Sequence, residues 1–182
     1  MRGGRWWLVI GCVIVLNACG TTHYPNDPMG GALRARRLMV PVEGITPDDV
    51  PDTFHAQRDN GRRTHRASDI MAPEGTAVVS ADDGQVFKLR ENRLGGMTLY
   101  ATDPEQRFLY YYAHLSGYRR GLQEGMRIRR GTVLGYVGHT GNALASAPHL
   151  HFQVMEFAPR RWWDGRAIDA RPYLATAGRV IE

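Results

Sequence analysis

The chain has 182 residues, of which 23% are charged and 43% hydrophobic, and its formal net charge is +5. This length suffices for one core of ordinary size, and no basic run with interleaved aromatic residues indicates nucleic acid binding. The only two cysteines, Cys12 and Cys19, lie in or at the end of the N-terminal leader, so the domain that follows has no disulfide and no thiol nucleophile.

The first residues resemble an export signal. A short basic region precedes the apolar run 6–16, which is too short to span a membrane and is typical of a secretory leader. The string Leu-Asn-Ala-Cys ending at Cys19 resembles the lipobox of bacterial lipoproteins, and Gly20 after it resembles the class directed to the outer membrane. We therefore expect a signal peptide over 1–18 and a lipidated Cys19 that anchors the protein at the periplasmic face of that membrane. The alternative is an ordinary signal peptide.

Residues 19–38 are polar and rich in proline and glycine, which predicts a flexible tether. Its arginines at 34, 36 and 37 are expected to form a solvated run. The main domain is expected over 39–158, and the C-terminal segment 159–182 is expected to pack onto it. Within that segment Trp162-Trp163 could stack on a sugar, but burial in packing is the favoured interpretation because Trp is generally buried.

From residue 76 onward the pattern is one of short strands separated by turns. Strands are expected over 76–81, 85–90, 97–102, 107–115, 125–129, 132–137 and 148–155. Asp82-Asp83-Gly84 is a good hairpin turn between the first two strands, and Arg130-Gly131 indicates another turn. Because no long amphipathic helix intervenes, the fold class expected is all-β, an antiparallel β-sandwich or open barrel.

Side chains two residues apart point to the same face of a strand. In the last strand this alternation separates an apolar face from a polar one: Leu150, Phe152 and Val154 on the first, His149, His151 and Gln153 on the second. In the strand 107–115 the same alternation places His114 on the face of Tyr112. By the same rule, His65 and Asp69 share one face of an earlier strand.

Five groups could together form a metal centre: His65, Asp69, His114, His149 and His151. Catalytic zinc takes three protein ligands and keeps a fourth position open. The other two groups would then support the ligands, act as a general base or stabilise an oxyanion. Spacing alone leaves the roles open. The remaining histidines are expected at the surface or, for His139, in a structural turn.

Family resemblance makes the assignment specific. The order and spacing of several strings between His65 and Met155, about half of the chain, resemble the lysostaphin/LytM-type zinc metallopeptidases, which cut peptide cross-links in bacterial peptidoglycan. The strings are His65-x-x-x-Asp69, Tyr112-Ala113-His114-Leu115, Gly135-Tyr136-Val137-Gly138, Thr140-Gly141 and Pro148-His149-Leu150-His151-Phe152. One departure is Ala67, where the family usually has glycine, and a local backbone adjustment is expected there.

The resemblance implies a fold like the duplicated hybrid motif, with one Zn²⁺ in a groove. It implies that His65, Asp69 and His151 are the zinc ligands and that His114 and His149 are the catalytic histidines. A role for Tyr112 at the oxyanion is the less favoured alternative to packing. The expected activity is a zinc endopeptidase that acts on peptidoglycan stem peptides as a lipid-anchored monomer. The alternative is a non-catalytic peptidoglycan-binding regulator of cell-wall amidases, for which gaps among the five groups would be expected.

Overall fold

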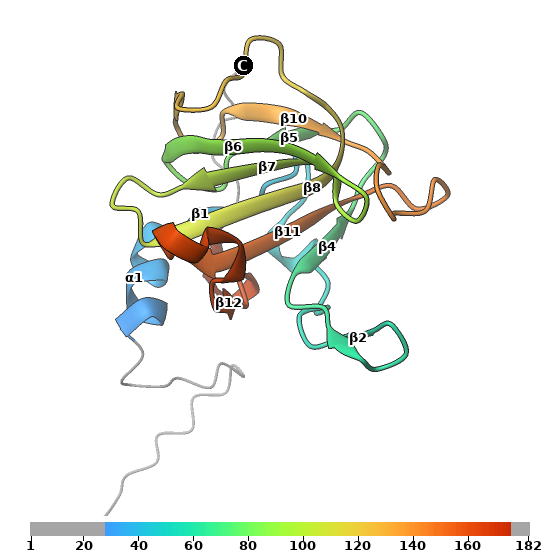
Figure 1. Ribbon diagram of the computed structural model, residues 1–182, viewed down its shortest axis with the longest axis horizontal. Helices are drawn as coiled ribbons and strands as arrows, with labels where there is room; N and C mark the ends of the chain where they lie inside the picture. The colour runs from blue at the N-terminus through green and yellow to red at the C-terminus, as the bar shows by residue number, and fades with distance from the viewer. Residues whose placement is uncertain (1–27, 176–182) are drawn as a thin grey trace, which may run out of the picture.

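A computed structural model describes residues 28–175, which fold mainly into β-strands (Figure 1). The helical elements are α1 (Pro28–Arg36) and three 3-10 helices, η1 (Pro47–Asp49), η2 (Pro159–Asp164) and η3 (Arg171–Tyr173). The strands are β1 (Leu38–Met39), β2 (Gln57–Arg58), β3 (Arg63–Thr64), β4 (Ser68–Met71), β5 (Ala77–Val79), β6 (Gly84–Asn92), β7 (Gly96–Thr102), β8 (Phe108–Tyr118), β9 (Arg127–Ile128), β10 (Val133–Val137), β11 (His149–Glu156), β12 (Ala167–Ile168) and β13 (Leu174–Ala175). Over residues 28–175, no helix combines the length and the apolar character that crossing a membrane requires.

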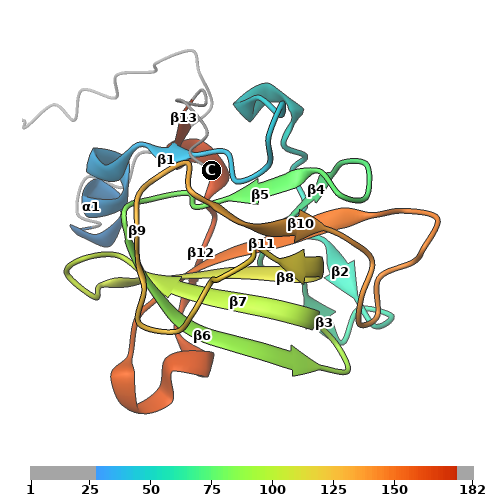
Figure 2. The same ribbon diagram turned by 90° about the horizontal axis from the view of Figure 1, so that it is seen from above.

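The main sheet has nine strands, and all its pairings are antiparallel. Its order is β12-β11-β8-β7-β6-β9, with β4 added to β11 and β10 joining both β5 and β8 (Figure 2). The aromatic strand β8 lies at the centre, as its high β-propensity favours. The apolar face of β11 is fully buried at Leu150, Phe152 and Val154. The predicted all-β antiparallel fold and the two faces of β11 are therefore confirmed.

The predicted hairpin at Asp82-Asp83-Gly84 is wrong. β5 pairs with β10, whereas β6 pairs with β7 and β9. Asp82 is buried and accepts a hydrogen bond of 2.7 Å from the hydroxyl of Tyr110, so this segment is anchored to the core. Arg130-Gly131 does form a turn. The strands on either side of it do not pair with each other, because β9 pairs with β6 and β10 pairs with β5 and β8. Turn residues favour a reversal of the chain, while core packing decides which strands pair.

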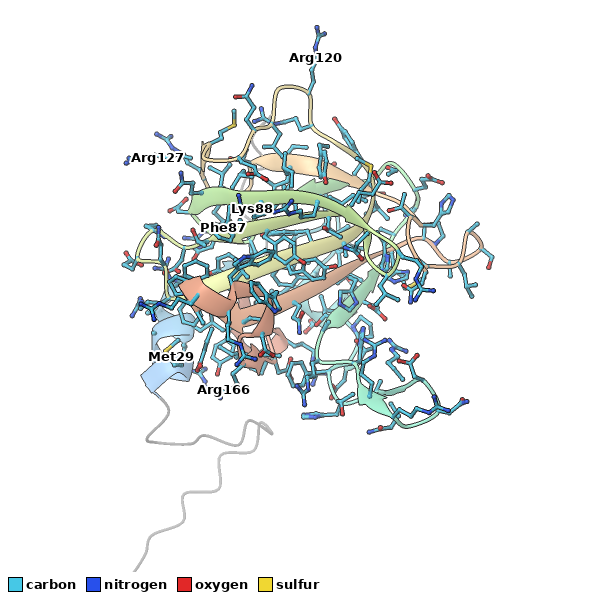
Figure 3. All side chains as sticks on the ribbon, viewed as in Figure 1. Met29, Phe87, Lys88, Arg120, Arg127 and Arg166 are labelled. Atoms are coloured by element: carbon cyan, nitrogen blue, oxygen red, sulfur yellow. The ribbon has the colours of Figure 1, made fainter. Side chains whose placement is uncertain are left out.

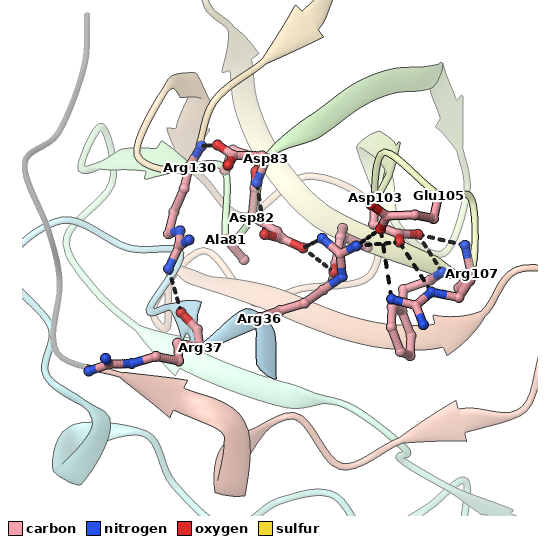
Figure 4. Close-up of polar contacts among 12 residues, drawn as sticks. Arg36, Arg37, Ala81, Asp82, Asp83, Asp103, Glu105, Arg107 and Arg130 are labelled. Atoms are coloured by element: carbon pink, nitrogen blue, oxygen red, sulfur yellow. Dashed lines mark hydrogen bonds and ion pairs between the residues drawn. The ribbon is translucent and has the colours of Figure 1, made fainter. Parts of the chain in front are cut away.

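The expectation of a flexible tether up to residue 38 is wrong from Pro28 onward. Residues 28–36 form α1, whose Leu33 is fully buried, and β1 pairs in parallel with β13 near the other end of the described chain. Arg36 is not part of a solvated run, because it lies close to Asp82 and Asp103, at 2.8 Å each, and also contacts Glu105 (Figure 4). The leader, Cys19 and the rest of the expected tether lie outside the described residues.

As far as residue 175, the C-terminal segment contacts the sheet. The ring of Trp162 contacts Phe87 and Tyr100 edge-on, with centroids 5.5 and 4.8 Å away, and β12 extends the sheet beside β11. Trp163 differs from the expectation of packing, since it is 62% exposed and contacts the ring of Trp162. Residues 176–182 lie outside the described chain.

Candidate metal centre and active-site cleft

Strand pairing brings together ligands that are far apart in sequence. β11 lies between β4 and β8, and its His151 is directly opposite Asp69 on one side and Ala113 on the other. Side chains of directly paired residues in antiparallel strands are close neighbours. The register therefore places a carboxylate beside an imidazole, and His149 lies two residues away on the same face of β11.

His65 reaches the same point by a different route from the one predicted. β4 begins only at Ser68, so His65 lies in the preceding loop rather than on the strand of Asp69. The chain turns at Arg66, whose φ is +60°, and the backbone NH of His65 donates to the carbonyl of Ala56 at 2.9 Å. The left-handed residue is Arg66 and not Ala67, and the side chain of Ala67 is buried.

Three donor atoms converge at the floor of a cleft. Nε2 of His65, Oδ1 of Asp69 and Nδ1 of His151 are 3.0 to 3.1 Å from one another. This spacing is close to the edge of about 3.3 Å that a tetrahedron with zinc bonds of 2.0–2.1 Å would have. Two imidazoles and one carboxylate also match the donor set of catalytic zinc sites. The three residues therefore fit a Zn²⁺ ion with a fourth position open to the cleft.

Neighbouring groups fix the orientation of these ligands. The Nδ1 of His65 donates to the carbonyl of Thr53 at 2.9 Å, which leaves a lone pair on Nε2 for a metal. The other carboxylate oxygen of Asp69, Oδ2, accepts from the guanidinium of Arg58 at 2.6 Å, which leaves Oδ1 for the metal. Burial raises the pKa of Asp69, but the two imidazoles beside it, of His151 and His65, outweigh that effect and hold the pKa well below its usual range. The ligand is therefore a carboxylate.

His114 and His149 stand beside the three donors. The His114 ring lies 4.9 Å from the ring of His149 and 5.7 Å from that of His151. The Nδ1 of His114 donates to the carbonyl of Thr140 at 2.8 Å, and that of His149 to the carbonyl of Ala147 at 2.9 Å. Because a carbonyl can only accept, each neutral ring keeps a lone pair on Nε2. Burial lowers the pKa of His114 to about 4, so this ring is neutral at neutral pH.

The predicted face of His114 is wrong. Tyr112 is fully buried in the core, and its hydroxyl accepts a hydrogen bond from the NH of Ala81. It is therefore a packing residue, which excludes a role at the oxyanion. His114 lines the cleft instead, together with Tyr111. The cause is a left-handed backbone at His114, with φ of +63°. At this point the pairing of β7 with β8 shifts register between Met97 and Leu99.

Two loops hold His114 in this orientation. The NH of His114 donates to the carbonyl of Gly95, and the NH of Asn142 donates to that of Leu94, so the loops before β7 and after β10 are joined. They approach so closely that a Cβ on Gly96 would lie 2.2 Å from the hydroxyl of Thr140. These loops also form part of the cleft wall, through Leu94 and Asn142 among others.

The cleft has a volume of about 830 Å³ and contains all five predicted site residues. Two groups of lining residues were missed in the sequence. One is the stacked pair Tyr100 and Tyr111, with ring centroids 4.6 Å apart, which would have required knowing the backbone reversal at His114. The other is a set of arginines between residues 58 and 66, whose clustering is visible in the sequence but whose place beside the metal centre is not.

Comparison with known proteins agrees with this geometry. Over 119 residues the chain is 34% identical to the L-Ala–D-Glu endopeptidase of Bacillus subtilis, covering 63% of this chain and 35% of the relative. Over 132 residues it is 33% identical to the peptidoglycan DD-endopeptidase ShyC of Vibrio cholerae, covering 71% and 29%. The structure of Helicobacter pylori Csd3 matches with a TM-score of 0.58 and 26% identity, covering 80% of this chain and 35% of Csd3.

The chain spans about a third of the length of these curated relatives. The family model described as peptidase family M23 matches residues 63–170. That range includes all three metal ligands and both cleft histidines. The resemblance seen in the sequence motifs is thereby confirmed, and the chain belongs to peptidase family M23.

Proposed function

We propose that this protein is a zinc metallo-endopeptidase that hydrolyses peptide cross-links of bacterial peptidoglycan. The observation that carries the proposal is the convergence of His65, Asp69 and His151 on one point, with His114 and His149 beside it. The names of the two curated relatives point to peptidoglycan peptides as the substrate class, but they specify different bonds. The substrate is therefore assigned as a class.

Zinc held by the three ligands supplies Lewis acidity that lowers the pKa of the attacking water and polarises the scissile carbonyl. One of the two cleft histidines, His114 or His149, accepts the proton of that water at its free Nε2 and passes it to the leaving amine. The other histidine, when its Nε2 carries a proton taken up from solvent, donates a hydrogen bond to the oxyanion that develops on the carbonyl. The carbonyls of Thr140 and Ala147 keep both rings oriented for these transfers.

The second candidate, a regulator that binds peptidoglycan without cutting it, is disfavoured by the complete set of five groups in the cleft. A regulator has no use for a metal centre with two histidines oriented beside it. A zinc hydrolase acting on a protein is separated from the main proposal by offering the enzyme both a protein and purified sacculi.

We further propose that a lipidated Cys19 anchors the protein at the periplasmic face of the outer membrane, where it acts as a monomer on nearby wall. The support is the lipobox-like string that ends at Cys19, with Gly20 after it. Mass spectrometry of the protein extracted from membranes would reveal the acyl chains. A mature protein without lipid, processed elsewhere, would contradict the anchor but not the catalytic proposal.

The test of activity combines zinc content with analysis of the muropeptides released from purified sacculi. The wild-type protein is expected to contain one zinc per chain and to release new products. Asp69→Ala should lose both zinc and activity, because a charged ligand is removed. His149→Ala should keep zinc but lose turnover by at least about 100-fold, the usual contribution of a general acid or base.

Each outcome decides a separate point. A His149→Ala protein without zinc would show that the ligand assignment is wrong. A wild-type protein that holds zinc but digests neither sacculi nor a protein substrate would contradict the endopeptidase and favour the regulator.

A further inference from the structure

One rim of the cleft is strongly basic. Four arginines line it, and we call them the arginine rim: Arg58, Arg62, Arg63 and Arg66. The carboxylates that line the cleft are Asp59 and Asp69, and the opposite wall is uncharged, with residues such as Asn142 and Leu144. The charge of the cleft is therefore concentrated on one side of the metal centre.

The backbone of the arginine rim is fixed by hydrogen bonds. β2 and β3 form an antiparallel hairpin in which Arg58 faces Arg63. Its turn has left-handed residues at Asp59 and Asn60, with φ of +53° and +56°, a conformation that suits the twist of a tight hairpin. Beyond it, the NH of Arg66 donates to the carbonyl of Phe54 at 2.8 Å. The arginines are thus presented on a defined scaffold.

Two of the four charges are compensated and two are not. Arg58 pairs with the metal ligand Asp69, and Arg63 pairs with Asp59. Arg62 and Arg66 are exposed, and neither forms an ion pair with any residue between 28 and 175. A metal ion beside them adds further positive charge. The cleft is therefore suited to a ligand that brings negative charge.

We propose that Arg62 and Arg66 bind a free carboxylate of the peptide substrate beside the scissile bond. This inference rests on the proposed endopeptidase function and narrows its substrate to acidic stem peptides rather than neutral bridges such as oligoglycine. A planar guanidinium matches a carboxylate through two parallel hydrogen bonds. The uncharged opposite wall then contacts the rest of the peptide. The arginine rim acts in specificity and takes no part in the proton transfers.

The test uses two synthetic cross-linked stem peptides that differ only in one group, a free carboxylate next to the cleaved bond or its amide. The zinc-loaded protein is expected to cleave the acid with a kcat/KM higher by about tenfold or more, since hydrogen bonds between charged groups are worth this much. The double variant Arg62→Gln/Arg66→Gln should lose this preference, because its cleavage of the acid falls by about tenfold more than its cleavage of the amide. Its zinc content should match that of the wild type.

A matched control removes the same charge from elsewhere. Arg120 and Arg127 are exposed and lie at the opposite side of the molecule from the β2–β3 hairpin (Figure 3). The variant Arg120→Gln/Arg127→Gln should keep the full preference for the acid. If it loses the preference to the same extent, long-range attraction by net charge explains the selectivity, and the proposed binding by the arginine rim is wrong.

The outcomes separate this inference from the proposed function. Equal cleavage of acid and amide by the wild-type protein overturns the inference and leaves the endopeptidase standing. If the zinc-loaded protein cleaves neither peptide, the proposed endopeptidase activity on these cross-links is wrong. Fluorescence anisotropy with the labelled peptides then measures whether the arginine rim binds the acid more tightly than the amide. Tighter binding of the acid that is lost in the double variant supports the rim, and equal binding overturns it. Should the double variant fail to fold, each single variant is expected to lose part of the preference.

Discussion

At the scale of single residues, the conformation of His114 determines which side chains face the metal centre. A left-handed backbone at a residue other than glycine costs about 1–2 kcal/mol. Here it is held by the carbonyl of Gly95, which accepts from the backbone NH, and by that of Thr140, which accepts from the ring. Backbone strain of this kind is concentrated at functional sites, where the surroundings over-determine the conformation. The result is that His114, which simple alternation places on the same face as Tyr112, lines the cleft instead.

Gly96→Ala is expected to reduce activity without removing the metal. Gly96 has φ of +63°, and an added Cβ would lie 2.2 Å from Oγ1 and 2.4 Å from the carbonyl carbon of Thr140. Displacing Thr140 shifts His114, and a misplacement of about 1 Å can cost about 100-fold in rate. The measurement is kcat on sacculi or a cross-linked peptide, with zinc content determined in parallel.

The control is Gly117→Ala in β8, where an added Cβ meets nothing within 4 Å and φ is not in the left-handed region. Its activity should stay close to that of the wild type. A Gly96→Ala protein that is fully active would show that the contact between the two loops does not position His114.

At the scale of elements, α1 depends on contacts with the sheet rather than on its own sequence. It contains Gly30 and Gly31, which weaken a helix by about 1 kcal/mol each relative to alanine, and at nine residues it is short for an isolated helix in water. Leu33 is buried under it, and Arg36 bridges the carboxylates of Asp82 and Asp103 (Figure 4). The largely buried guanidinium of Arg36 therefore connects the helix to the two loops that carry Asp82 and Asp103.

Arg36→Met is expected to lower the free energy of unfolding by about 3–5 kcal/mol, because it leaves two buried carboxylates without their cation. Urea unfolding followed by circular dichroism measures this loss. Arg34→Met on the same helix is the matched control: Arg34 is exposed and lies over the ring of Tyr173, so its loss should be about 1 kcal/mol or less. Equal losses in the two variants would show that the buried ion pairs contribute nothing specific.

At the scale of the whole molecule, the metal centre joins parts of the chain that are far apart in the sequence. His65 comes from the loop after the β2–β3 hairpin, Asp69 from β4 and His151 from the middle of β11. Because the ligands come together only in the folded chain, metal binding favours that state over the unfolded one. Stability and metal occupancy are therefore coupled.

Zinc at 100 times its dissociation constant is expected to stabilise the folded protein by about 2.7 kcal/mol, which corresponds to a rise in Tm of about 5–10 °C for a domain of this size. Differential scanning calorimetry with and without a chelator measures the shift. His149→Ala should show the same shift as the wild type, and Asp69→Ala should show none. A shift that persists in Asp69→Ala would place the metal elsewhere.

The sequence predicted those features that depend on local pattern. Alternation along β11 correctly assigned His149 and His151 to the cleft and Leu150 and Phe152 to the core. Alternation failed at His114 because one left-handed residue reverses the faces beyond it, and nothing in the side-chain pattern announces such a residue.

Features that depend on tertiary contacts were not predictable in this way. The helix α1 has a sequence typical of a linker. It forms because Arg36 pairs with two buried carboxylates and Leu33 packs into the hydrophobic core. The basic character of the arginine rim can be seen in the sequence. Its place in the cleft depends on the position of the β2–β3 hairpin, which the sequence does not show.

The order of the ligands along the chain has a consequence for biosynthesis. His65 and Asp69 lie in the first half of the described chain, whereas His151 lies in β11, and β13 must still arrive to pair with β1. A chain that emerges with its N-terminus first therefore carries two ligands without the third from residue 69 until residue 151 is made. Long-range pairings of this kind form late. A nascent chain that ends before His151 cannot assemble the three-ligand site, so a complete metal centre arises only when most of the described chain has been made.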